Sequence, residues 1–298
     1  MSGLLFGTAG WSFADWAGKF YPTAASKKPL EFYSDYFECA EVNVTFYRPP
    51  EVKLSAGWVK KVDGKKFIFA VKVSQEFTHE PAARVGAASS EPVWGAAEAK
   101  KFLEGIAPIE AAGRLGPLLL QFPWSFRNTP EARERIARLG DAFAPKQVVV
   151  ELRHASWERP EVVEWMRERG IGYVNIDQPA ERDCLGPSEH VTSDVAYVRL
   201  HGRNVEKWFA KDIEPHERYD YWYPEKELDP WAERIKRMMA RSKALFVIGN
   251  NHYRGKAPAN ALQLKAKVTG KKVRVPEPLV VAFPVLKGIA EKEKGTLF

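Results

Sequence analysis

The chain has few cysteines and no long apolar run, and each shortage excludes a class of protein. Two cysteines among 298 residues, Cys39 and Cys184, cannot form the disulfide framework of a small secreted domain. No stretch of 18 apolar residues occurs, so we expect no membrane-spanning helix and no membrane partner. The start, MSGLLFGTAGW, lacks the basic segment and apolar core of a signal peptide, so we expect a cytoplasmic protein.

Familiar cofactor patterns are missing as well. The six histidines show no HxH or HExxH spacing, and neither a CxxC pair nor an EF-hand loop occurs. No GxGxxG follows the first apolar run, which argues against a dinucleotide. The sequence therefore names no cofactor, and a divalent metal stays open.

The chain carries more positive than negative charge. Lys and Arg number 45 against 38 Asp and Glu, a formal net charge of +7. Such a charge permits attraction to phosphates. Four lysine pairs carry much of the excess: Lys60-Lys61, Lys65-Lys66, Lys100-Lys101 and Lys271-Lys272. We interpret these pairs as solvated helix ends and turns rather than a track for nucleic acid.

Short apolar runs alternate with stretches of helical periodicity. Runs rich in Val, Ile, Leu and Phe are typical of parallel strands covered on both faces. The predicted strands are Leu4–Ala9, Cys39–Thr45, Phe67–Ser74, Leu118–Phe122, Val148–Arg153, Tyr173–Asp177, Ala196–His201 and Leu245–Asn250. The clearest helices are Pro130–Phe143, Pro160–Arg169, Pro230–Arg241 and Ala257–Val268, with Thr129 and Asp229 as N-caps.

This alternation favours a parallel sheet, and eight units favour closure of the sheet into a barrel. We predict an α/β fold, a single (β/α)8 TIM-barrel domain over residues 1–298. Pro179–Val191 is too broken for a helix, so the crossover after the sixth strand should be irregular. Long connections, Gln75–Ala97 and Gly202–Asp229, follow the third and seventh strands at the C-terminal face, where barrel enzymes keep substrate loops.

Polar residues recur late in the predicted strands. Side chains alternate between the two faces of a strand, and the apolar residues should pack outward against helices. We therefore expect the polar residues to point into the barrel. In chain order they are Glu41, Asn43 and Thr45; Lys72 and Ser74; Gln121; Glu151 and Arg153; Asn175 and Asp177; Tyr197, Arg199 and His201; and Asn250 and Asn251. Buried charges must pair or meet a ligand, because an unpaired one costs several kcal/mol.

Charge and chemistry assign provisional roles within this set. Lys72, Arg153 and Arg199 would hold a phosphate or carboxylate. Glu151, Asp177 and His201 would move protons as catalytic residues, or together bind a metal. The other predicted ligand-binding residues are Trp11, Glu41, Asn43, Tyr47, His79, Gln121 and Asn251. A self-satisfied ion network that only fills the barrel mouth is the competing interpretation.

The motifs resemble a known family. They are GTAGWSFADWAGKFYP, FECAEVNVTFYRPP, FAVKVSQEFTH, LLLQFPWSF, VVVELRHASW, YVRLHGR and GNNHYRGKAPANA, between Gly7 and Ala261. They resemble the family called domain of unknown function 72, or YecE-like, which implies a (β/α)8 barrel but no reaction. The matching positions include Gly10, Trp11, Trp16, Glu41, Asn43, Thr45, Phe46, Tyr47, Lys72, Thr78, His79, Gln121, Glu151, Arg153, His201, Gly202, Asn251, Ala257 and Asn260. Gly249 departs from the family, which often has a larger residue there, and should leave extra room beside the eighth strand.

Three functions remain open. The first is an enzyme acting on a small polar ligand, anionic and phosphorylated or carbohydrate-like, by hydrolysis, isomerisation or lyase chemistry. The second is a protein that processes or binds nucleic acid, suggested by the basic charge and by aromatic residues after several strands. The third is a non-catalytic ligand-binding module on a barrel scaffold. The sequence does not indicate the oligomeric state.

Overall fold

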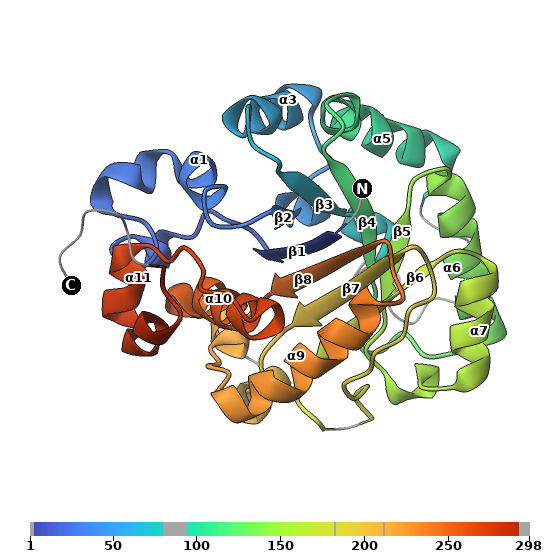
Figure 1. Ribbon diagram of the computed structural model, residues 1–298. Coiled ribbons are helices and arrows are strands. Elements are labelled where there is room, and N and C mark those ends of the chain that lie inside the picture. The colour runs from blue at the N-terminus through green and yellow to red at the C-terminus, as the bar shows by residue number, and fades with distance from the viewer. Residues whose placement is uncertain (1–2, 80–93, 182, 211, 292–298) are drawn as a thin grey trace.

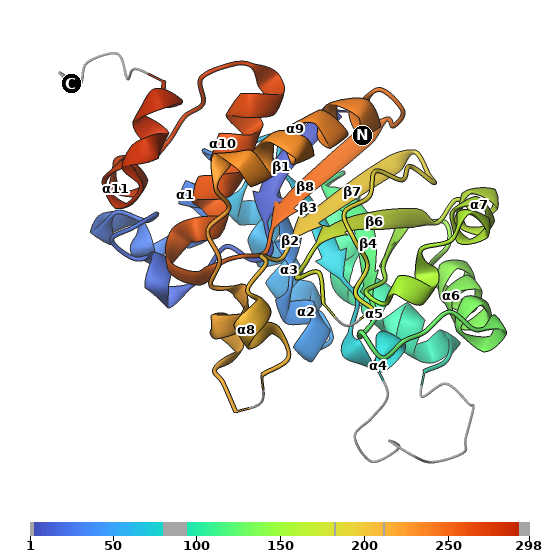
Figure 2. The ribbon, with the colours of Figure 1, turned by 90° about the horizontal axis from the view of Figure 1, so that it is seen from below.

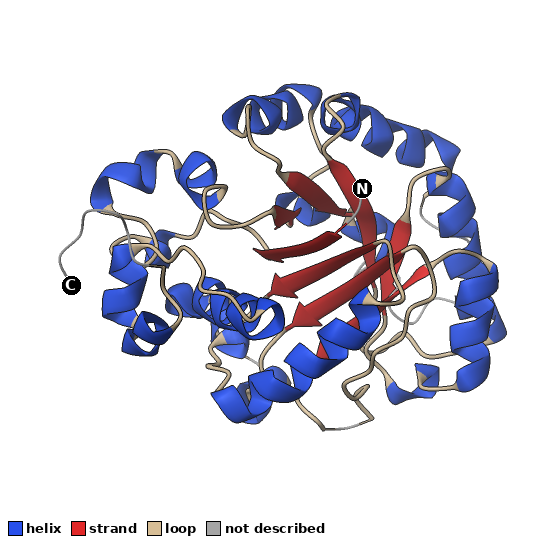
Figure 3. Cartoon of the chain, viewed as in Figure 1, coloured by secondary structure: helices blue, strands red, loops and turns tan. Residues whose placement is uncertain are grey.

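The computed structural model describes residues 3–79, 94–181, 183–210 and 212–291, and its strands form one parallel sheet. The strand order is β1-β8-β7-β6-β5-β4-β3-β2, so the sheet curls into a nearly closed barrel with helices around it (Figure 1, Figure 3). The strands are β1 (Gly3–Thr8), β2 (Cys39–Val42), β3 (Ile68–Lys72), β4 (Leu115–Gln121), β5 (Val148–Glu151), β6 (Gly172–Asp177), β7 (Val195–Leu200) and β8 (Ala244–Gly249). The predicted (β/α)8 architecture is confirmed.

The helices lie mainly outside the sheet. They are α1 (Pro29–Tyr33), α2 (Val44–Tyr47), α3 (Val52–Lys61), α4 (Gln75–Thr78), α5 (Ala96–Ala111), α6 (Pro130–Phe143), α7 (Pro160–Glu168), α8 (Val205–Trp208), α9 (Glu225–Met239), α10 (Lys256–Thr269) and α11 (Glu277–Ala282). Short 3-10 turns include η5 (Pro215–Tyr219) and η6 (Tyr253–Gly255). In the described part of the chain, no helix has the length and apolar character needed to cross a bilayer.

One predicted helix start is right and another is wrong. Thr129 caps α6 as expected, because its Oγ1 accepts a hydrogen bond of 3.2 Å from the Ala132 amide. Helix α9 instead begins at Glu225, so Asp229 lies inside the helix and does not cap it. Acidic residues in its first turn favour this earlier start, and Pro230 is accommodated within the helix.

The connections on the C-terminal side follow the prediction in part. Between β6 and β7 no helix occurs among described residues 178–181 and 183–194, which confirms an irregular crossover. In its described residues, the long connection after β7 contains only α8 and η5 before α9 begins. The connection after β3 begins with α4, and residues 80–93 of the predicted Gln75–Ala97 loop lie outside the described residues. Figure 2 shows α2, α4 and α8 on one side of the molecule, toward which β7 and β8 point.

Most strands end earlier than predicted, and β2 does so by the most residues. Asn43 adopts helical angles, φ −90° and ψ −24°, and directly precedes α2 at its N-cap position, so Glu41, Asn43 and Thr45 do not share a strand face. The Thr45 hydroxyl lies within hydrogen-bond distance of the Val42 carbonyl at 3.0 Å and the Lys72 carbonyl at 2.6 Å, which ties this turn to β3. Ser74 likewise leaves β3 and precedes α4.

The barrel closes between β1 and β2 by an irregular seam. Ala9 bridges Glu41, and the Gly10 amide donates to the Glu41 carbonyl at 2.9 Å. The Thr8 amide finds no strand partner here and donates to Tyr33 Oη of α1 at 2.7 Å. Gly7 is required at this seam, because a Cβ there would lie 2.2 Å from the Cys39 carbonyl oxygen.

Gly249 lets α10 pack close to β8. A Cβ at this position would lie 3.2 Å from the Ala257 carbonyl oxygen and 3.3 Å from the Ala257 Cβ. The prediction of extra room beside the eighth strand is therefore wrong, because α10 occupies that space.

Candidate functional site

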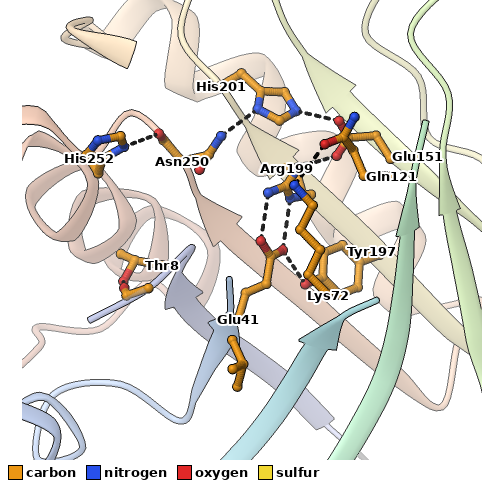
Figure 4. Close-up of polar contacts among 12 residues, drawn as sticks. Thr8, Glu41, Lys72, Gln121, Glu151, Tyr197, Arg199, His201, Asn250 and His252 are labelled. Carbon is orange, nitrogen blue, oxygen red and sulfur yellow. Dashed lines mark hydrogen bonds and ion pairs between the residues drawn. The ribbon is translucent and has the colours of Figure 1, made fainter. Parts of the chain in front are cut away.

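A buried ion network spans the barrel from β2 to β5 (Figure 4). Arg199 of β7 donates from Nε and Nη2 to the two carboxylate oxygens of Glu41, at 2.9 and 2.7 Å. Its Nη1 contacts the carboxylate of Glu151. Tyr197 Oη donates to Glu41 at 2.9 Å. All three guanidinium nitrogens of Arg199 are thus engaged within the protein, and its side chain is 2% exposed, so this arginine is the least accessible cation of the site.

The charges of this network stabilise one another. Burial by itself raises the pKa of Glu151, but Arg199, Arg153 and His201 overcome that effect and hold the pKa well below its usual range. Burial lowers the pKa of Arg199, and Glu151 and Glu41 outweigh it and raise the value. Both groups therefore stay charged at neutral pH, and Glu151 is a poor general acid.

His201 joins the network immediately after β7. The amide nitrogen of Asn250 lies 2.9 Å from His201 Nδ1. An amide nitrogen can only donate, so the ring hydrogen is assigned to Nε2. That nitrogen lies 3.2 Å from Glu151 Oε1 but is not aligned for a hydrogen bond. Burial lowers the pKa of His201 to about 4, so the ring is neutral at pH 7.

Lys72 and Gln121 form a second, outer pair at the ends of β3 and β4. Lys72 Nζ donates to Gln121 Oε1 at 2.8 Å and lies 3.7 Å from the ring centroid of Phe46. Among the described residues no carboxylate lies within ion-pair distance of Nζ. Burial, with Arg199 and Arg153 adding to it, lowers the pKa of Lys72 to about 7 despite the opposing charges of Glu41 and Glu151.

Arg153 lies at the edge of the network. Its Nε and Nη2 lie 2.7 Å from the same oxygen of Glu151, and its guanidinium lies 5.6 Å from the ring centroid of Trp208. The Arg153 side chain is 15% exposed, and Lys72 is 8% exposed, whereas Arg199 is 1% exposed. Lys72 and Arg153 are therefore the cations of this site nearest to solvent.

Three predicted ligand-binding residues lie in the turns that follow β2 and β3. Asn43 has a buried Oδ1 with no hydrogen-bond partner in the described chain. The ring of His79 lies 5.1 Å from that of Phe46, and burial, with Lys72 and Arg153 adding to it, lowers its pKa to about 4. Tyr47 is 71% exposed. Of the three, Asn43 has an acceptor that no described residue uses, whereas His79 Nδ1 lies 2.9 Å from the Thr78 hydroxyl.

The connection between β7 and α9 covers the network, as expected of a long connection at the C-terminal face, but the sequence did not predict which of its side chains lie there. The rings of Trp208 in α8 and Tyr219 in η5 lie 6.0 and 6.5 Å from the ring of His201. These residues lie in an aperiodic loop, so no strand or helix pattern could have placed them. Asn250 was among the polar residues expected to point into the barrel, and its contact with His201 agrees, because it continues the alternation of Phe246 and Ile248 along β8.

Asp177 faces the wrong way for the predicted role. Residues that lie opposite each other in parallel strands have side chains on the same face of the sheet. Ile176 lies opposite Arg199, which points into the barrel, so the next residue, Asp177, is on the outer face of β6. There it accepts hydrogen bonds from Tyr223 Oη at 2.9 Å and from Trp231 Nε1 of α9 at 2.5 Å.

The outer position of Asp177 corrects two expectations. Asn175, on the same face, contacts Met238 of α9, so neither residue points into the barrel. Arg203 pairs with Asp177 through two bonds of 2.8 and 2.7 Å, which anchors the covering connection. Glu151, Asp177 and His201 do not converge, and no group of three His, Cys, Asp or Glu within the described residues could hold a metal.

Two other predicted ligand-binding residues also lie apart from the network. Trp11 packs edge-on against Trp58 of α3 and Phe69 of β3, with ring centroids 5.7 and 6.0 Å apart. Asn251 donates to the Tyr221 carbonyl and to Asn260 Oδ1, both at 2.9 Å. Asn251 thus ties the covering connection to α10.

Comparisons with known proteins agree with this architecture. The family described as protein of unknown function DUF72 matches residues 5–281. A solved DUF72 family protein from Thermotoga maritima is 34% identical, with 89% of this chain and 99% of that chain covered and a TM-score of 0.79. Another from Enterococcus faecalis is 27% identical, with 89% and 95% covered and a TM-score of 0.77. No protein of curated function matches significantly.

The family match extends from β1 into α11, and the structural match to the Thermotoga maritima protein covers nearly all of that protein. These findings show that the chain belongs to the DUF72 family of proteins of unknown function.

Proposed function

We propose that the protein is an enzyme that binds a small anionic ligand, phosphorylated or carboxylated, at the C-terminal mouth of the barrel. The observation that carries this proposal is the charge of the mouth. Three cations, Lys72, Arg153 and Arg199, face two carboxylates, Glu41 and Glu151, and arginines engage both carboxylates. Lys72 is left with a neutral amide as its hydrogen-bond partner.

A ligand anion would supply the missing countercharge. A buried ammonium without a carboxylate is costly, which is why burial lowers the pKa of Lys72 to about 7. An anion placed between Lys72 and Arg153 would favour the charged lysine and accept hydrogen bonds from both side chains. Arg199 would act indirectly, by holding Glu41 and Glu151 in place.

The arrangement of charge favours a small ligand over a nucleic acid. Helices α3 and α10 end at Lys61 and Thr269, beside the face where strands begin. Three of the four lysine pairs follow or end these helices, so they lie on the side of the barrel away from the mouth. The aromatic side chains at the mouth, such as Tyr47 and Trp208, and these lysines would therefore not contact the same nucleic-acid strand.

Thermal melting with a ligand panel tests the proposal. Inorganic phosphate, citrate and glycerol 3-phosphate are compared with neutral glycerol at equal concentration. An anion at ten times its Kd should stabilise the folded state by about 1.4 kcal/mol, a shift of a few degrees. We expect the shift to vanish in Lys72→Met and Arg153→Met.

The matched control is Lys61→Met, which removes the same charge from an exposed position at the end of α3. This variant should keep the full shift. Equal shifts in all variants would locate anion binding elsewhere. The absence of any shift with every anion would reject the proposal.

A further inference from the structure

Lys72 has the surroundings of a reactive amine as well as those of an anion-binding group. It lies at the C-terminal end of β3, 8% exposed, at the edge of the mouth. Its Nζ has one hydrogen-bond partner among the described side chains, Gln121, and its other side faces the Phe46 ring. Gln121 Oε1 can accept an N–H hydrogen from the neutral amine, which leaves the nitrogen lone pair free.

We propose that Lys72 forms an imine with the carbonyl group of an anionic ligand, such as a 2-oxo acid or a phosphorylated aldehyde or ketone. This inference rests on the proposed function and names its substrate class. The Nζ lone pair forms a bond to the carbonyl carbon. The carbonyl oxygen then leaves as water, taking one hydrogen from the amine and one proton from solvent. The product is a protonated imine, whose single positive charge is that of the proton taken from solvent.

Among the described residues, four charged groups act on Lys72. Arg199 of β7 and Arg153 after β5 disfavour the ammonium, whereas Glu41 of β2 and Glu151 of β5 favour it. Lys72 also disfavours protonation of His79, which follows α4 and is neutral at pH 7. The two carboxylates are engaged with arginines. Burial and the two arginines therefore lower the pKa of Lys72 more than the carboxylates raise it.

The consequence is a large difference in reactivity between lysines. At pH 7 about half of Lys72 is uncharged, because its pKa is about 7. An ordinary lysine, with a pKa near 10.4, is uncharged in only about one molecule in 2,500. Since only the uncharged amine attacks a carbonyl, the available fraction at Lys72 is larger by about a thousandfold. Arg153 would hold the anionic end of the ligand while the carbonyl meets Lys72.

Borohydride trapping tests the inference. The full chain is incubated at pH 7 with dihydroxyacetone phosphate or pyruvate, reduced with sodium borohydride and analysed by peptide mass spectrometry. Reduction converts the imine to a stable secondary amine, with a mass gain equal to the ligand minus one oxygen atom. Glycerol 3-phosphate and lactate, which carry the same anions without a carbonyl, serve as matched controls. Parallel melting curves report binding of each ligand.

We expect a single adduct at Lys72 with at least one carbonyl ligand and none with its hydroxyl analogue. Lys72→Arg keeps a cation but offers no such nucleophile, so it should keep the melting shift and lose the adduct by at least about tenfold. Lys61→Met should retain the adduct. Adducts spread over surface lysines, or unchanged in Lys72→Arg, would overturn the inference.

Failure of the inference and failure of the proposed function can be told apart. A melting shift with both members of a ligand pair, but no adduct, would overturn imine formation and leave anion binding at the mouth intact. The absence of any melting shift and any adduct with all four ligands would count against both.

Discussion

At the scale of single residues, the three cations of the mouth differ in what they leave for a ligand. Arg199 uses all its guanidinium nitrogens within the protein. Arg153 contacts one oxygen of Glu151 and is partly exposed, and Lys72 contacts only Gln121 and the Phe46 ring among the described side chains. The sequence could identify these residues as a set, because they recur at strand ends. It could not rank them, because ranking depends on partners from distant strands.

The lowered pKa of Lys72 predicts a specific pH dependence of stability. Between a folded value of about 7 and an unfolded value near 10.4, the unfolded chain binds one more proton than the folded chain. The free energy of unfolding therefore rises with pH in this window, by up to about 1.4 kcal/mol per pH unit. This stabilising contribution is present above the unfolded pKa and is lost as pH falls through 7.

Urea denaturation of the wild type and Lys72→Met, from about pH 7 to pH 9.5, measures this effect. The stability difference should move in favour of the wild type as pH rises, because only the wild type carries the titrating amine. Parallel pH profiles for the two proteins would show that Lys72 has an ordinary pKa.

The buried acids should differ in their contribution to stability. Glu41→Gln leaves Arg199 with a single ionic partner and replaces one of the two oxygens that accept from Arg199 and Tyr197 with an amide group that cannot accept, so we expect a loss of about 3–5 kcal/mol. Glu151→Gln leaves Arg199 with both bonds to Glu41, and the freed Arg153 can reach water, so the loss should be about 1–3 kcal/mol. Chemical denaturation compares them, and a larger loss for Glu151→Gln would contradict this account of the network.

At the scale of elements, the close approach of β1 and β2 predicts that Gly7→Ala and Gly57→Ala change stability in opposite directions. Gly7→Ala places a Cβ 2.2 Å from the Cys39 carbonyl oxygen and must separate the two strands, at a cost of about 3 kcal/mol. Gly57 in α3 has no atom within 4 Å of an added Cβ, so Gly57→Ala should instead stabilise by about 0.5–1 kcal/mol. Thermal melts measure both, and similar effects of the two substitutions would refute the close seam.

The sequence predicted the elements better than their orientation. Eight apolar runs became eight strands within a few residues, because each is buried on both faces and needs little context. The early end of β2 was missed, because it depends on a Thr45 hydroxyl that reaches the carbonyl of Lys72 in another strand. The alternation of side chains along β6 indicated that Asn175 and Asp177 share a face. It did not indicate whether that face is the inner or the outer one, because their partners Met238 and Trp231 lie in α9.

At the scale of the whole molecule, the net positive charge affects the binding of DNA, whereas the charges of the mouth affect the binding of a small ligand. The lysine pairs give an exposed basic surface, mostly on the side of the barrel away from the mouth. We predict that DNA binds weakly and without sequence preference, and that retention on a DNA column is lost between about 50 and 200 mM salt through counterion release. Tight binding that survives 200 mM salt would favour a nucleic-acid function over a small ligand.

The central claim is that the barrel mouth binds an anion through Lys72 and Arg153. A crystal structure of the protein soaked in about 100 mM phosphate tests it most directly, because even millimolar sites fill at that concentration. The account predicts phosphate density within hydrogen-bond distance of Lys72 Nζ and the Arg153 guanidinium, with the bonds between Arg199 and Glu41 unchanged. Density for water alone at the mouth, with Lys72 and Arg153 bonded only to Gln121 and Glu151, would contradict it.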